Sequence, residues 1–191
     1  MATEANGPGT TASTARGGGV AWSAHINVKV DDGTGANCYG DNDPTLSDWL
    51  DVTNFGFTAV SGTVDGVTVT LKRKAENSGY IGDERVQLIK GGTASGDNKA
   101  TATNWTTSWV SEAHGGAADL WSLTLADTDI TASTFGVRVA ADVEFDYTAY
   151  IDYISIEVQY TSGGGPSTGP IGGLTGGGLV DSGLVDSGLV G

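Results

Sequence analysis

Residues 154–160 read Ile-Ser-Ile-Glu-Val-Gln-Tyr, and residues 67–71 read Val-Thr-Val-Thr-Leu. In both stretches an apolar side chain alternates with a polar one, which is the period of a β-strand with one buried and one solvated face. Residues 135–139 (Phe-Gly-Val-Arg-Val) and 121–125 (Trp-Ser-Leu-Thr-Leu) alternate in the same way. We therefore expect a half-buried strand in each of these four places.

The alternating segments are short and separated by turn residues, and no stretch shows a sustained helical period. This pattern predicts an all-β fold in which antiparallel sheets pack face to face as a sandwich spanning residues 20–161. One turn of helix is expected at 127–133, and connectors are expected at 91–92, 95–98 and 114–116. The side chains expected to point into the core are Val67, Val69, Leu71, Trp121, Leu123, Phe135, Val137, Ile154, Ile156 and Val158.

Two Gly-rich segments flank the predicted sandwich, and the chain as a whole has 31 glycines. Residues 1–19 carry too little apolar surface to offset the entropy of ordering, so we expect a flexible N-terminal arm. Residues 162–191 form a second expected arm, in which Gly-Leu-Val-Asp-Ser occurs twice. Exposed Leu-Val pairs are unfavourable without a partner, so this arm is predicted to dock on one, with a disordered linker as the alternative. The predicted partner-binding residues are Leu179, Val180, Leu184, Val185, Leu189 and Val190.

Charge and cysteine content exclude several classes of protein. The formal net charge is −14, so neither nucleic acid nor an anionic membrane is an expected partner, because both require Lys and Arg at the contact. Cys38 is the only cysteine, so no intrachain disulfide can form. No apolar run has the length that a membrane span needs, and residues 1–20 lack the basic-then-apolar order of a signal peptide.

The residues that usually carry catalysis are scattered. His25 and His114 are isolated, and no His or Cys spacing typical of a metal site occurs, so we expect neither enzymatic activity nor a cofactor. Acidic residues gather in a Gly- and Asn-rich stretch, where carboxylate oxygens are candidate Ca²⁺ ligands and a solvated acidic loop is the alternative. These candidate ligands are Asp31, Asp32, Asp41 and Asp43.

Two tryptophans lie in a segment rich in Thr and Ser. Exposed indole rings can stack on sugars, so Trp105 and Trp109 are candidate glycan-binding residues. The alternative is that both rings pack against the sandwich and anchor the loop that carries them.

Several segments between residues 46 and 161 together resemble the β-sandwich (jelly-roll-like) domain of phage virion structural proteins, which include capsid decoration (cement), head-fibre and tail-fibre-like subunits. The segments are 53–57 (Thr-Asn-Phe-Gly-Phe), 64–73 (Val-Asp-Gly-Val-Thr-Val-Thr-Leu-Lys-Arg), 83–92, 97–100, Trp105, 115–116, 119–121, 130–137, 149–152 and 158–161. None of them carries a catalytic motif, so the resemblance implies a scaffold.

The resemblance implies a non-enzymatic virion structural subunit on the virion surface, assembled in the bacterial host cytoplasm. We expect such a subunit to attach through its terminal arms to the capsid or other virion proteins, and to bind copies of itself as a homotrimer. A carbohydrate-binding or adhesion module that uses exposed Trp side chains is the alternative.

Overall fold

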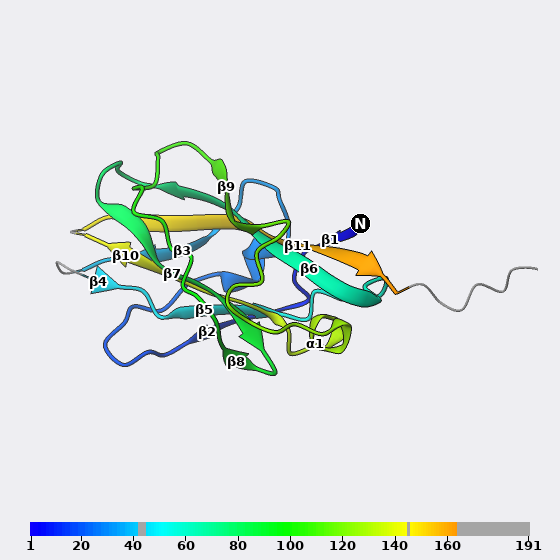
Figure 1. The fold of residues 1–191 in the computed structure, drawn as a ribbon. Helices are drawn as coiled ribbons and strands as arrows, with labels where there is room; N and C mark the ends of the chain where they lie inside the picture. The colour runs from blue at the N-terminus through cyan, green and yellow to red at the C-terminus, as the bar shows by residue number, and fades with distance from the viewer. Residues whose placement is uncertain (42–44, 145, 164–191) are drawn as a thin grey trace, which may run out of the picture.

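The computed structural model describes residues 1–41, 45–144 and 146–163. Over these residues the chain forms two antiparallel sheets packed face to face, which confirms the predicted all-β sandwich (Figure 1). The strands are β1 (Ala2–Asn6), β2 (Thr10–Thr14), β3 (Ala36–Tyr39), β4 (Thr45–Leu46), β5 (Trp49–Thr53), β6 (Gly62–Ala75), β7 (Ile81–Lys90), β8 (Thr93–Ala94), β9 (Val110–Gly116), β10 (Gly136–Val143) and β11 (Thr148–Ser162).

The first sheet has the order β1-β11-β6-β9, and β3 pairs with the first half of β11. Its centre is the long antiparallel pair of β6 and β11, in which Val69 lies opposite Ile156 and Leu71 opposite Ile154. The register of this pair shifts between Ile151 and Tyr153, so Asp152 lies in a β-bulge. The second sheet has the order β2-β5-β10-β7-β8, and β4 pairs with the end of β10.

The core between the sheets contains the side chains that the alternation predicts. Nine of the ten predicted residues are fully buried, and Leu123 is partly buried against the same core. Phe55 and Phe57 extend this core, and the ring of Phe57 meets that of Phe135 edge to face. Period-two alternation on β6, β10 and β11 therefore identifies the inward face of each strand correctly.

The predicted strand at residues 121–125 is absent, because Trp121 and Ser122 both have a positive φ, which no extended strand allows. Asp119 Oδ1 accepts a hydrogen bond from Trp121 N at 2.8 Å, and the indole Nε1 donates to the carbonyl of Val67 at 2.9 Å. Trp121 is therefore a core residue, as predicted, but its side chain enters the core from a turn and not from a strand.

The predicted N-terminal arm at residues 1–19 is wrong, because this segment supplies one strand to each sheet. β1 pairs with β11 in the first sheet and β2 pairs with β5 in the second, so the chain crosses from one sheet to the other at Gly7-Pro8-Gly9. A Cβ on Gly7 would lie 2.7 Å from the hydroxyl of Tyr153, and one on Gly9 would lie 2.6 Å from the carbonyl of Asn54. Backbone pairing and close packing at these glycines order a segment that has little apolar surface.

The single helical turn is confirmed as α1 (Asp127–Thr131), where Asp129 Oδ2 accepts a hydrogen bond from the N-cap Ala126 N at 2.9 Å. Residues 114–116, predicted to be a connector, are instead the end of β9, paired with residues 67–69 of β6. The second predicted arm and its Leu-Val pairs lie outside the described residues from residue 164 onward.

Candidate functional site

The candidate Ca²⁺ ligands that the structure describes, Asp31, Asp32 and Asp41, do not form a metal-binding group. Asp31 makes an ion pair with Lys72, and Asp32 Oδ1 accepts a hydrogen bond from Thr34 N at 2.8 Å within its own loop. Asp43 lies outside the described residues. Across residues 1–41, 45–144 and 146–163, no group of three or more His, Cys, Asp or Glu side chains could hold a metal ion.

Trp105 is not exposed, which corrects its prediction as a glycan-binding residue. Its side chain is buried, and the indole Nε1 donates a hydrogen bond to Asp83 Oδ1 at 2.9 Å. Trp109 is half-buried, and its ring meets that of Tyr150 edge to face with 6.5 Å between centroids. The ammonium of Lys74 lies 4.6 Å from the centroid of Trp109, so a cation already contacts this indole.

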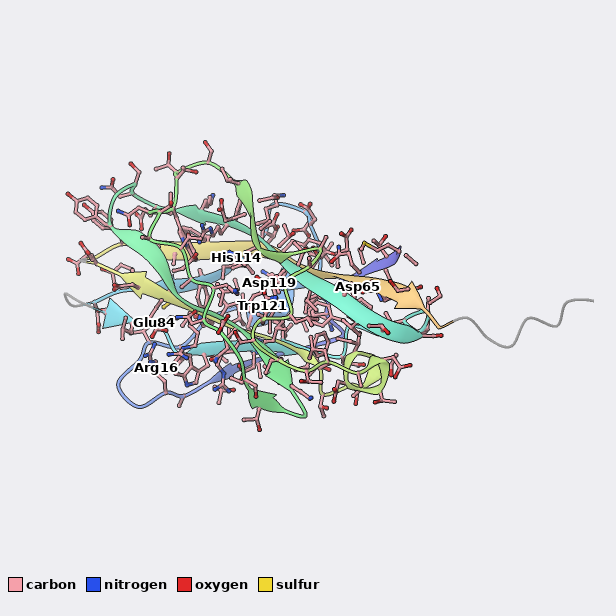
Figure 2. All side chains as sticks on the ribbon, viewed as in Figure 1. Arg16, Asp65, Glu84, His114, Asp119 and Trp121 are labelled. Atoms are coloured by element: carbon pink, nitrogen blue, oxygen red, sulfur yellow. The ribbon has the colours of Figure 1, made fainter. Side chains whose placement is uncertain are left out.

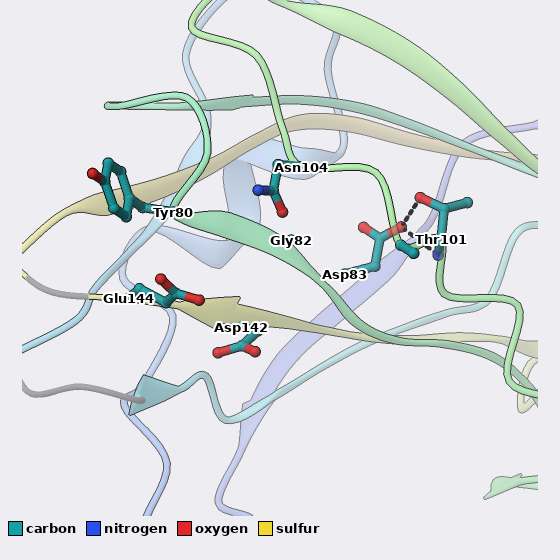
Figure 3. A pocket seen from close by; sticks show the side chains of 8 residues that line it. Tyr80, Gly82, Asp83, Thr101, Asn104, Asp142 and Glu144 are labelled. Atoms are coloured by element: carbon teal, nitrogen blue, oxygen red, sulfur yellow. Dashed lines mark hydrogen bonds between the residues drawn. The ribbon is translucent and has the colours of Figure 1, made fainter.

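Asp83 is the centre of a buried polar network that joins β7, β6 and the segment after β8. Its carboxylate pairs with Arg73 and accepts hydrogen bonds from Thr101 N at 3.1 Å and Thr101 Oγ1 at 3.0 Å (Figure 3). Both Asp83 and Arg73 are almost fully shielded from solvent, with side-chain exposures of 0% and 5%. A buried pair that is hydrogen-bonded this fully fixes the position of the loop that carries Trp105.

His114 lies beside this network on β9, and Figure 2 places it in the middle of the sandwich. Its Nδ1 is 2.9 Å from the carbonyl of Lys99, so Nδ1 carries the proton of the neutral ring, and Nε2 faces Asp83 Oδ2 at 3.9 Å. Burial, together with the nearby charge of Arg73, lowers the pKa of His114 below its usual value. The neutral imidazole is thus the stable form, and its buried position keeps it from an external substrate.

Cys38 and His25 offer no better nucleophile. The Cys38 thiol is buried and donates to the carbonyl of Val20, and burial raises its pKa to about 12. A thiol of this kind is not a reactive thiolate. His25 lies next to a hydroxyl, with Nδ1 3.0 Å from Thr11 Oγ1.

A cleft of about 190 Å³ opens between the ends of β7 and β10 and the loop that follows β8 (Figure 3). It is lined by Tyr80, Gly82, Asp83, Thr101, Ala102, Asn104, Asp142 and Glu144. The carboxylate of Asp83 is already satisfied by Arg73 and Thr101. The cleft is therefore polar and small, and it lacks the apolar walls that most ligand pockets have.

The outer face of the second sheet carries the most distinctive cluster of the described residues. Trp49 on β5 is surrounded by Arg16, Arg85 and Arg138, whose guanidinium carbons lie 4.1, 5.2 and 5.2 Å from the ring centroid. The chain has four arginines, so three of them meet at one tryptophan. Leu50 and Val52, the alternate residues of β5, are buried, which places Trp49 on the opposite, outward side of that strand.

Two carboxylates hold these arginines in place. Arg138 makes a bidentate pair with Asp51, with distances of 2.6 Å from Nε and 2.7 Å from Nη2. Glu84 pairs with Arg16 at 3.1 Å, and Figure 2 shows these two side chains beside each other at one end of the sheet. We call Arg16, Trp49, Arg85 and Arg138, with Asp51 and Glu84, the arginine–tryptophan face.

Sequence reasoning missed this face, although a signal for it exists. Trp49, Asp51 and Arg138 occupy the polar positions of alternating strands, where a large aromatic side chain is unexpected. The register brings Arg138 opposite Asp51, which no single segment reveals.

In comparisons with known proteins, no protein-family model, curated protein or solved structure matches this chain. Among the described residues, no helix is both long and apolar enough to cross a membrane.

Proposed function

We propose that the chain is a non-enzymatic structural subunit of a phage virion, a capsid decoration or head-fibre protein that binds the particle surface. The observation that carries this proposal is the arginine–tryptophan face. Trp and Arg are among the residues most enriched at the energetic centres of protein interfaces, and here they gather on the outer side of a sheet. The resemblance of residues 46–161 to virion sandwich domains supports the same role.

The chemistry of the face defines the kind of partner that it fits. The three arginines outnumber Asp51 and Glu84, so the face has a small positive excess in a chain whose net charge is −14. Each guanidinium group is planar and presents several N–H donors to carboxylates and backbone carbonyls. The partner surface is therefore an acidic loop of a capsid or other virion protein, and residues 164–191 supply a second attachment.

The test is cosedimentation of the purified protein with phage particles that lack it. Trp49→Ala should weaken binding roughly 30-fold, as the loss of a central interface anchor does. Trp109→Ala is the matched control, because it removes a half-buried tryptophan from the loop before β9, beside the other sheet, and it should bind as the wild type does. Unchanged binding by Trp49→Ala would count against this role for the face.

Self-assembly as a homotrimer belongs to the same proposal, because a disulfide-free sandwich gains stability by burying surface against copies of itself. Sedimentation equilibrium should give three times the mass of the chain. A stable monomer at micromolar concentration would contradict the trimer.

A second function, glycan binding, is favoured by one observation. The rings of Trp109 and Tyr150 form an angle of 77° on the outer side of the first sheet, and Trp109 is only half-buried. If this pair binds sugars, glycans should quench tryptophan fluorescence in the wild type and in Trp49→Ala but not in Trp109→Ala.

A further inference from the structure

A lysine and two aspartates meet on the outer side of the first sheet, far from the arginine–tryptophan face in the fold. Lys72 of β6 lies next to the β-bulge of β11, and its Nζ is 2.6 Å from Asp152 Oδ2. The same Nζ contacts the carboxylate of Asp31, which belongs to the loop before β3. Gly33 N, from that loop, donates a hydrogen bond to Asp152 Oδ1 at 2.9 Å.

The three groups differ sharply in their exposure. The side chain of Asp152 is 0% exposed, that of Lys72 is 23% exposed and that of Asp31 is 55% exposed. The loop that carries Gly33 covers Asp152. The Trp109 ring lies 5.9 Å from Lys72 Nζ and packs closely over Gly35, where a Cβ would come within 2.9 Å of the indole. The carboxyl of Asp152 is thus held out of water against an amine, with a third group at the solvent edge.

We propose that Lys72 and Asp152 join in an intramolecular isopeptide bond, which covalently links β6 to β11. The three requirements of this reaction are present: an amine at contact distance, a carboxyl fixed by a backbone donor, and a second carboxylate that can move a proton. Holding the amine and the carboxyl at contact removes the entropic cost of bringing two free groups together, which is one part of the barrier to such a condensation.

The step balances without any co-reactant. The Lys72 ammonium transfers one proton to Asp152 Oδ2, which gives a neutral amine and a neutral carboxylic acid. Lys72 Nζ then forms a bond to Asp152 Cγ, and Gly33 N–H stabilises the negative charge that develops on Oδ1. Asp31 takes the second proton from Nζ and delivers it to Oδ2, which leaves as water when the Cγ–Oδ2 bond breaks. The products are one amide and one water, and Asp31 is regenerated.

The noncovalent pair is the starting state of this reaction. Hydrogen bonds to Asp152 and then to Asp31 raise the pKa of Lys72, so the amine begins protonated and must lose a proton to Asp152 before it can attack. Lys74 makes a useful contrast, since it contacts the Trp109 and Tyr150 rings and, within the described part of the chain, forms no ion pair.

The intact mass of the purified full chain, measured after denaturation, tests the proposal. The wild type should be lighter than its sequence requires by the mass of one water, and digestion should yield a branched peptide that joins residue 72 to residue 152. Lys72→Arg keeps a cation for both aspartates but cannot form the amide, so it should have the full mass. Lys74→Arg is the matched control and should lose one water as the wild type does.

A second source of water loss must be separated from this one. Asp32-Gly33 and Asp65-Gly66 can form cyclic imides, which also remove one water, but hydroxylamine cleaves imides and leaves an amide intact. A wild type with the full mass, or a water loss that persists in Lys72→Arg or disappears with hydroxylamine, would overturn the proposal. In newly synthesised chains followed from their first folding, Asp31→Asn should form the amide about a hundred-fold more slowly than the wild type, and amide formation at the wild-type rate would refute the proton-transfer role of Asp31.

Discussion

His114 makes the stability of the fold depend on pH. Its pKa is lowered in the folded state, whereas in the unfolded chain it titrates near 6.5. The unfolded state therefore binds the proton more readily, so the stabilisation is fully present above pH 6.5 and decreases as the pH falls through the folded-state pKa. His114→Asn, whose amide can keep the hydrogen bond to Lys99, should flatten this decrease in urea midpoints measured between pH 7.5 and 5. An equally steep decrease in the variant would assign the effect to other groups.

Trp121 is one of the largest side chains in the core. It is fully buried, and its indole nitrogen donates to Val67 inside the sandwich. Trp121→Ala should lower the free energy of unfolding by about 3–5 kcal/mol, measured by urea denaturation. Trp109→Ala, at a half-buried site, should cost less than about 2 kcal/mol. A cost for Trp121→Ala below about 1 kcal/mol would show that this indole does not fill the core.

At the scale of elements, β1 protects the edge of the first sheet. It pairs with residues 156–160 of β11, and the Glu4 carboxylate accepts hydrogen bonds from Thr58 N at 3.1 Å and Ala59 N at 2.9 Å. Deleting residues 1–6 would leave that edge of β11 unpaired, and unpaired edges promote association between chains. The truncated protein should melt at a lower temperature and show a sedimentation coefficient that rises with concentration. A truncated chain that behaves like the wild type in both measurements would show that β1 is dispensable.

The elements also show which parts of the fold can be predicted from the sequence. Alternation locates β6, β10 and β11 and their inward faces, because burial of one face of a strand is a local property. It fails at Trp121, where an indole–carbonyl hydrogen bond and a turn replace the expected strand. It also fails at β1 and β2, whose residues are small and polar and are ordered mainly by pairing with distant strands. The arginine–tryptophan face escapes detection for a related reason, since its members come from separate segments of the chain and meet only through strand register.

At the scale of the whole molecule, the sandwich and the last residues of the chain should be separable. Deleting residues 174–191 leaves every strand of the described fold in place. The deletion removes all six Leu and Val residues of the repeated Leu-Val pairs. The melting temperature should therefore stay unchanged, while cosedimentation with particles or self-association weakens. Full attachment and assembly by the deletion variant would show that these residues act only as a spacer.

Because Ala2 pairs with Tyr160, the first residue of the chain and the last strand end at the same end of the domain. Residue 1 and the end of β11 emerge side by side at one pole, while β4 lies toward the opposite pole (Figure 1). If residues 164–191 tether the domain, the first residue of the chain must face the surface to which it is tethered. A reporter fused there would be crowded against that surface, whereas one inserted in the turn between β6 and β7, at residues 76–80, would be displayed outward.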